Sequence, residues 1–144
     1  TNGLLAFTVT STDAAGNEST NTALISDNDG GVTIDTGAPE LSSVSIASNG
    51  NSDGTLAKAS QEVTLTFTAD EAIGTPTVTF NSGGANNNIT NANNITVTGS
   101  GTDWTAKYTV AQGDTDGAVG FSISFSDLTG NAGDAVTQVT NGGG

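Results

Sequence analysis

One short pattern of side chains that can bind a cation occurs twice in this chain. D-x-x-G-N is found in DAAGN at residues 13–17 and again in DLTGN at residues 127–131, a separation of 114 residues (13 to 127). Its Asp and Asn side chains carry the oxygen ligands that Ca²⁺ prefers in proteins. The same residues also suit a hairpin turn, in which Asp caps backbone N–H groups and Gly or Asn adopts the left-handed conformation. The pattern alone leaves both interpretations open.

Composition restricts the chemistry that the rest of the chain can support. The 144 residues include 15 Asp and Glu against Lys58 and Lys107, for a formal net charge of −13. Nucleic acid and anionic membrane surfaces are therefore poor partners. Because His, Cys and Met are absent, zinc, haem and iron–sulfur sites lack their usual ligands and no nucleophile–base pair of the usual kind can form. We predict that the protein is not an enzyme, and no apolar run is long enough to insert in a membrane.

Alternation of apolar and polar residues is the main structural signal. In EVTLTFTA at residues 62–69, Val63, Leu65 and Phe67 share one face and threonines occupy the other, as in a half-buried antiparallel strand. Trp104 lies on the apolar face of a similar run, so we expect it in the core and not in a sugar site. Turn-rich stretches separate the runs. We expect seven strands, at residues 41–46, 62–69, 75–80, either 88–91 or 94–98, 104–110, 119–126 and 134–140.

Seven short strands in about 100 residues predict an all-β fold, a seven-stranded antiparallel immunoglobulin-like Greek-key sandwich. The repetition at 114 residues divides the chain further. Residues 1–30 are expected to be the last two strands, a hairpin, of an incomplete upstream repeat. Residues 31–39 form an inter-repeat linker, and residues 40–144 form a complete repeat. The chain is therefore expected to be a fragment of a longer protein.

This fold predicts that acidic residues from separate loops converge. The loops after residues 69 and 126 and the loop before residue 104 gather at the end of the sandwich where the linker arrives. That end would hold Asp27, Asp29, Asp35, Asp70, Glu71, Asp127 and Asn131. Ca²⁺ takes six to eight oxygen ligands in irregular geometry and suits such a site, with Mg²⁺ as second choice. Weaker candidate ligands are Asp13, Asn17, Asp114 and Asp116, whereas Asp53 is expected to serve a turn only.

The two recurring patterns resemble those of a known family. F-x-V-x-x-x-D-x-x-G-N at residues 7–17, followed by the V-T-I-D-T-x-A-P pattern in VTIDTGAP at residues 32–39, is similar to tandem bacterial immunoglobulin-like repeats of giant calcium-dependent adhesins that are exported by type I secretion. The resemblance implies a secreted or cell-surface location and a non-catalytic spacer repeat. It also implies contact with neighbouring repeats and joints stiffened by Ca²⁺. Gly37 departs from the pattern, because a second Thr is common there.

Two other functions remain open from the sequence. The polar, Asn-rich stretch at residues 81–94 could recognise a glycan or a surface. Alternatively, the chain could be a self-assembling extracellular filament subunit. The second possibility depends on residues 4–26, because an isolated hairpin is marginal in water and would expose Leu5, Phe7 and Val9. We expect this hairpin to pack against another copy of the chain, by strand exchange or by edge-to-edge pairing.

Overall fold

The computed structural model describes residues 3–24, 32–83 and 94–140. Two compact units make up the chain, residues 1–37 and residues 38–144. Both units are all-β, with antiparallel pairing throughout, and the described residues form no α-helix. This confirms the all-β class expected from the alternating sequence pattern.

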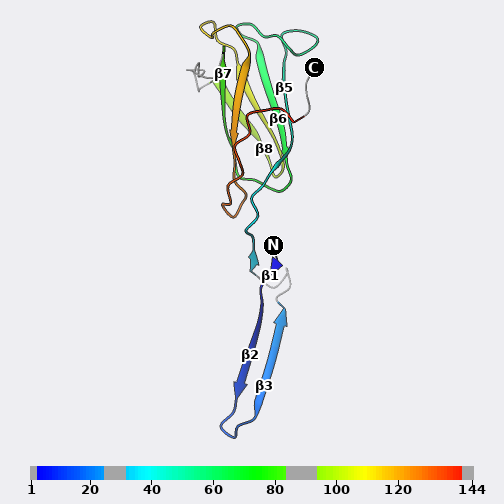
Figure 1. The fold of residues 1–144 in the computed structure, drawn as a ribbon, viewed down its shortest axis with the longest axis vertical. Coiled ribbons are helices and arrows are strands. Elements are labelled where there is room, and N and C mark those ends of the chain that lie inside the picture. Colours follow the sequence, from blue (N-terminus) through cyan, green and yellow to red (C-terminus); the bar gives the residue numbers. More distant parts are fainter. Residues whose placement is uncertain (1–2, 25–31, 84–93, 141–144) are drawn as a thin grey trace. The chain divides into compact units, whose positions relative to one another are not determined.

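The first unit is built around a β-hairpin (Figure 1). Strand β2 (Ala6–Thr12) pairs with β3 (Glu18–Leu24), from Ala6 opposite Leu24 to Thr12 opposite Glu18. Two shorter strands, β1 (Gly3–Leu4) and β4 (Thr33–Ile34), pair with each other. Alternation in β2 places Phe7 and Val9 on one face, and both side chains are exposed, as is that of Leu5.

The second unit contains two antiparallel sheets. The larger sheet has the order β5 (Leu41–Ser48), β6 (Glu62–Ala69), β9 (Asp103–Thr109) and β8 (Ile95–Ser100). The smaller sheet pairs β7 (Thr77–Ser82) with β10 (Val119–Ser124). Thr, Val, Ile and aromatic residues, which favour extended backbone, dominate these strands. Together the two sheets give the unit its sandwich-like character.

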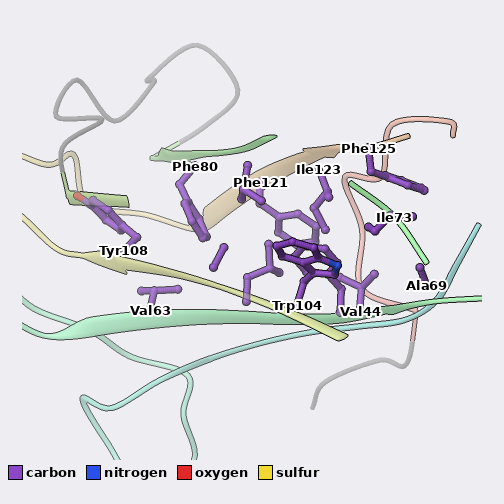
Figure 2. Packing of buried hydrophobic residues seen from close by; sticks show 14 residues of the cluster. Val44, Val63, Ala69, Ile73, Phe80, Trp104, Tyr108, Phe121, Ile123 and Phe125 are labelled. Atoms are coloured by element: carbon purple, nitrogen blue, oxygen red, sulfur yellow. The ribbon is translucent and has the colours of Figure 1, made fainter. Parts of the chain in front are cut away.

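The core lies between the two sheets, as Figure 2 shows. Each strand contributes the apolar side chains on its inner face, and the polar residues between them point outward. Phe80 from the smaller sheet stacks on Tyr108 from the larger sheet, with ring centroids 5.7 Å apart. Trp104 is buried, as expected. The buried hydrophobic residues are Val44, Val63, Leu65, Phe67, Ala69, Ile73, Val78, Phe80, Trp104, Ala106, Tyr108, Phe121, Ile123 and Phe125.

Most of the expected strands are present, with small shifts at their ends. The strand at 62–69 has the expected bounds. The strand expected at 75–80 begins at Thr77, after Pro76, which has no N–H to donate to a ladder. Of the two positions considered for the fourth strand, the later is confirmed as β8, and residues 88–91 lie outside the described residues.

The expectation of a continuous strand at 134–140 is wrong. Ser126 pairs with Ala132 directly after the turn, but farther on Ile123 pairs with Val136, a slip of one residue. The slip follows Gly133, where a side chain would collide with the ring of Phe125 and the backbone oxygen of Pro39. The chain then crosses to the other sheet (red in Figure 1), where Thr140 N–H donates to the carbonyl of Val44 at 3.2 Å.

Candidate functional site

Three loops meet at one end of the second unit. The backbone N–H of Ala69 donates to the carbonyl of Thr102 at 2.9 Å, and the N–H of Ile73 donates to the carbonyl of Gly101 at 3.1 Å. Ile73 also forms an antiparallel bridge with Asp127. The loop after β6, the β8–β9 turn and the turn after β10 are therefore joined by backbone contacts, as the sandwich topology predicted.

The DLTGN turn is organised around the buried carboxylate of Asp127. Its Oδ1 accepts hydrogen bonds from the backbone N–H groups of Thr129 (2.9 Å), Gly130 (2.6 Å) and Asn131 (2.8 Å). Its Oδ2 accepts one from the Asn131 side-chain amide at 2.7 Å. Gly130 has φ of +99°, in the left-handed region that favours glycine. The hydroxyl of Thr129, which was not foreseen from the sequence, also donates to this carboxylate.

The DAAGN turn repeats this arrangement in the first unit. Asp13 Oδ1 accepts hydrogen bonds from the N–H groups of Ala15 and Asn17, both at 2.9 Å. The Asn17 side-chain amide donates to Asp13 Oδ2 at 2.8 Å, and Gly16 has φ of +88°. In each copy the N–H of the Asp donates to the carbonyl of the Asn at 3.0 Å. The turn interpretation is therefore confirmed for both copies.

Hydrogen bonding lowers the pKa of both turn carboxylates. Burial by itself would raise the pKa of Asp127, but the hydrogen bonds from Asn131, Thr129 and Gly130 together outweigh it and hold that pKa below its ordinary value. The hydrogen bond from the side chain of Asn17, followed by that from its backbone, lowers the pKa of Asp13. Both groups are thus ionised at neutral pH and acidic in character.

An acidic triad forms around one of these carboxylates. Asp35, Glu71 and Asp127 each place one carboxylate oxygen within 4.8 Å of the other two. Oxygen ligands on opposite sides of a Ca²⁺ ion, each at about 2.4 Å, lie about 4.8 Å apart. The triad could therefore hold one metal ion, with the remaining ligands supplied by second carboxylate oxygens, backbone carbonyls or water. Hard oxygen ligands of this kind suit Ca²⁺ or Mg²⁺ and not a softer metal.

The other candidate ligands are placed differently. Asp70 lies outside the triad, because its Oδ1 accepts the N–H of Glu40 at 2.8 Å and its own N–H donates to the carbonyl of Glu40 at 3.0 Å. The side-chain amide nitrogen of Asn131 donates to Asp127 and helps to hold the turn. Asp27 and Asp29 lie outside the described residues.

The D-x-D-G turn near residue 115 serves the loop before β10. Asp114 accepts hydrogen bonds from the hydroxyl of Tyr108 and, at 2.7 Å, from the N–H of Ala111. This contact gives the buried Tyr108 hydroxyl a partner, which the sequence did not reveal because the two residues belong to different elements. Asp116 is exposed. Neither residue belongs to the acidic triad.

A cleft of about 1070 Å³ lies in the second unit, away from the triad. Ile46, Val119 and Val139 contribute to its apolar surface, and Leu56 adds a largely exposed side chain. Asp114 and Asp116 are among its polar lining residues. The size is sufficient for a small organic ligand.

Comparison of the chain with family models, curated proteins and solved structures finds no match in any of the three. Within the described ranges, no helix is long and apolar enough to cross a lipid bilayer. The internal repetition and the geometry of the acidic triad are therefore the features of the chain that bear on its function.

Proposed function

We propose that this chain is a structural extender module from a bacterial surface adhesin, built from tandem immunoglobulin-like repeats. In this proposal, residues 132–140 take the place of a seventh strand despite the slip near Gly133. The observation that carries the proposal is the recurrence, 114 residues apart, of one turn with the same hydrogen bonds at Asp13 and at Asp127. A chain that repeats the same structural unit in this way is typical of a tandem array, in which each unit adds length.

The proposed mechanism is mechanical and uses Ca²⁺. Three carboxylates within 4.8 Å repel one another when no cation neutralises them. An ion bound by Asp35, Glu71 and Asp127 would remove this repulsion and connect the linker residue to two loops of the following repeat. The joint between repeats would become stiff, and the module would project from the cell surface. Asp70 carries a similar charge but would take no part.

Matched charge-neutralising substitutions test the calcium site. We expect millimolar Ca²⁺ to raise the thermal stability of the second unit, followed by the fluorescence of Trp104. An extracellular site with Kd near 10⁻⁴–10⁻³ M would stabilise it by about 1.4–2.7 kcal/mol at roughly 10 to 100 times Kd. Glu71→Gln should abolish the gain, whereas Asp70→Asn, a neutralisation at the neighbouring residue, should preserve it. An equal response in both variants would argue against the triad as the site.

The stiffening itself requires a separate measurement. Small-angle X-ray scattering of a chain with several 114-residue repeats should show a shorter maximum dimension and a broader distance distribution after chelation than in Ca²⁺. Unchanged dimensions would refute the mechanical role even if the ion binds.

The cleft favours a second candidate function, a module that binds a glycan or another small ligand. Its mixed lining, with Val119 and Val139 beside hydroxyl and carboxylate groups such as Thr115 and Asp116, is of the kind that such ligands use. A glycan array probed with the full chain tests this alternative, and a Val139→Trp variant that fills the cleft should lose any specific signal.

A further inference from the structure

The two copies of the repeated pattern differ greatly in how well their apolar faces are covered. Phe121 and Ile123 in β10 are 7% and 0% exposed, whereas Phe7 and Val9, which lie 114 residues earlier in β2, are 44% and 55% exposed. The turn is the same in both copies, and the first pair after it also matches, with Thr12 opposite Glu18 where Ser126 lies opposite Ala132. Among the described residues of the first unit, no strand pairs with the other edge of β2, and β10 shows which kind of strand fits there.

In the second unit, β10 pairs along one edge with β7. The register places Phe80 opposite Phe121 and Val78 opposite Ile123, so apolar residues meet on the core face. In the described part of the first unit, β2 pairs only with β3, which corresponds to the segment after β10. The other edge of β2 corresponds to the edge of β10 that β7 occupies.

Backbone direction supports this assignment of edges. The N–H of Asp13 donates to Asn17 across the hairpin. Alternate residues of a strand direct their N–H groups to opposite edges. The N–H groups of Phe7 and Val9 therefore point to β3, while those of Ala6 and Thr10 point to the other edge. Gly120, the counterpart of Ala6, indeed donates its N–H toward β7, to Asn81 Oδ1 at 3.1 Å.

We propose that the outer edge of β2 is a binding site for one extended, uncharged strand of the β7 type, with apolar side chains at alternate positions, added antiparallel to β2. Its Phe would lie opposite Phe7 and its Val opposite Val9. This inference rests on the equivalence of the two repeats in the proposed function, but it does not depend on calcium.

Charge favours this occupant over a second copy of the chain. Residues 77–82 (TVTFNS) contain no charged side chain, so such a strand meets little repulsion. Two whole chains, each with a net charge of −13, repel each other. Strand β2 (AFTVTST) is itself uncharged and lacks the Lys, Glu or Pro residues that protect exposed strand edges. Addition of a strand would use the backbone groups of Ala6 and Thr10 at this edge.

The repeat also predicts one difference in specificity. At Gly120, an added Cβ would collide with the side-chain oxygen of Asn81, and the first unit has Ala6 at this position. A strand that fits β2 should therefore carry a smaller residue than Asn opposite Ala6. A copy of residues 75–82 with Asn81→Ser should bind better than the unmodified copy.

The test joins this added strand to the amino end of the full chain. Because Ser82 lies opposite Val119, the counterpart of Leu5, the added strand would end close to the start of β2. A Gly/Ser linker of about five residues therefore suffices and gives a high effective concentration. The control carries the same extension with Val78→Thr and Phe80→Thr in the added copy only.

Amide hydrogen exchange resolved by residue gives the result. We expect the amides of Ala6 and Thr10 to exchange on the order of tenfold more slowly with the apolar strand than with the Thr control. The exchange rates of the Phe7 and Val9 amides, whose N–H groups point to β3, should change less. Equal exchange at Ala6 and Thr10 with both extensions would overturn the proposal.

A second measurement separates the remaining occupants. If the unextended chain already protects Ala6 and Thr10 in a concentration-dependent way, and light scattering gives a mass above that of one chain, a second copy occupies the edge and the proposal is wrong. If Ca²⁺ does not change the dimensions in the scattering experiment, the proposed mechanical function is contradicted, whereas the exchange result at Ala6 and Thr10 is unaffected.

Discussion

Truncation of Phe121 should show how much of the second unit's stability depends on contact between its two sheets. A phenylalanine side chain buries about 200 Å² of mostly apolar surface, and only 7% of Phe121 is exposed. At about 25 cal/mol per Å², its burial contributes about 4.7 kcal/mol, which is an upper estimate because the unfolded chain is not fully extended. The residual cavity adds to the loss, so Phe121→Ala should cost about 3–5 kcal/mol. This is a large share of the stability of an ordinary domain.

Trp104 makes the assay specific to the second unit. It is the only tryptophan in the chain, it is 7% exposed, and its indole N–H donates to the carbonyl of Gly101 at 3.1 Å. Urea unfolding followed by Trp104 fluorescence should therefore report the loss directly. Phe7→Ala provides the matched control, because the same repeat position belongs to the first unit. It should leave the Trp104 transition almost unchanged.

Two outcomes would refute this reasoning. One is a Phe121→Ala variant whose free energy of unfolding lies within about 1 kcal/mol of that of the wild type, which would contradict the typical cost of such a core truncation. The other is an equal shift of the Trp104 transition by Phe7→Ala. If Phe121→Ala does not fold at all, Phe121→Leu retains most of the apolar volume and should remain measurable at a cost of about 1–2 kcal/mol.

Further predictions concern backbone packing and charge. Gly133→Ala should destabilise the second unit by about 1–3 kcal/mol in urea unfolding, because its Cβ would lie 2.6 Å from the backbone oxygen of Pro39. Gly113→Ala, where nothing lies within 4 Å, should have little effect, and equal losses would show that the close approach at Gly133 is unimportant. Because the pKa of Asp13 is lowered in the folded hairpin, its hydrogen bonds with Asn17 stabilise the hairpin at pH values above 3.8, the ordinary pKa of the group. This stabilisation is lost as the pH falls through the lower pKa of the folded state. An NMR titration should therefore give an apparent pKa for Asp13 below 3.8, and a value at or above it would contradict the turn geometry.

The strands were predictable where burial alternates regularly. In residues 62–69, Val63, Leu65 and Phe67 all face the core, so the period alone located the strand. The segment after Gly133 could not be predicted in this way. Its course depends on the close approach of Gly133 to Phe125 and Pro39, two residues that lie far apart in the sequence. It also depends on the slip of one residue in the pairing register.

The acidic triad was predictable only as part of a larger set. Sandwich topology brought the linker and the loops after β6 and β10 to one end, which placed Asp35, Glu71 and Asp127 among the candidates. It could not separate Glu71 from Asp70. That distinction arises because Asp70 forms a pair of contacts with the backbone of Glu40, a local arrangement that no spacing in the sequence indicates.

The crossing of residues 132–140 between the sheets also determines how the second unit would respond to a pulling force. This segment and β5 both start at the end of the unit where the three loops meet, so they run in the same direction. The backbone N–H of Val44 donates to the Thr140 side-chain oxygen at 2.8 Å, and the backbone N–H of Thr140 donates to the carbonyl of Val44 at 3.2 Å. Tension applied through residues 38 and 140 would therefore act along these strands as shear. Under shear these two bonds must break together, whereas peeling would open them one at a time, so the Val44–Thr140 pair would resist separation of the two segments.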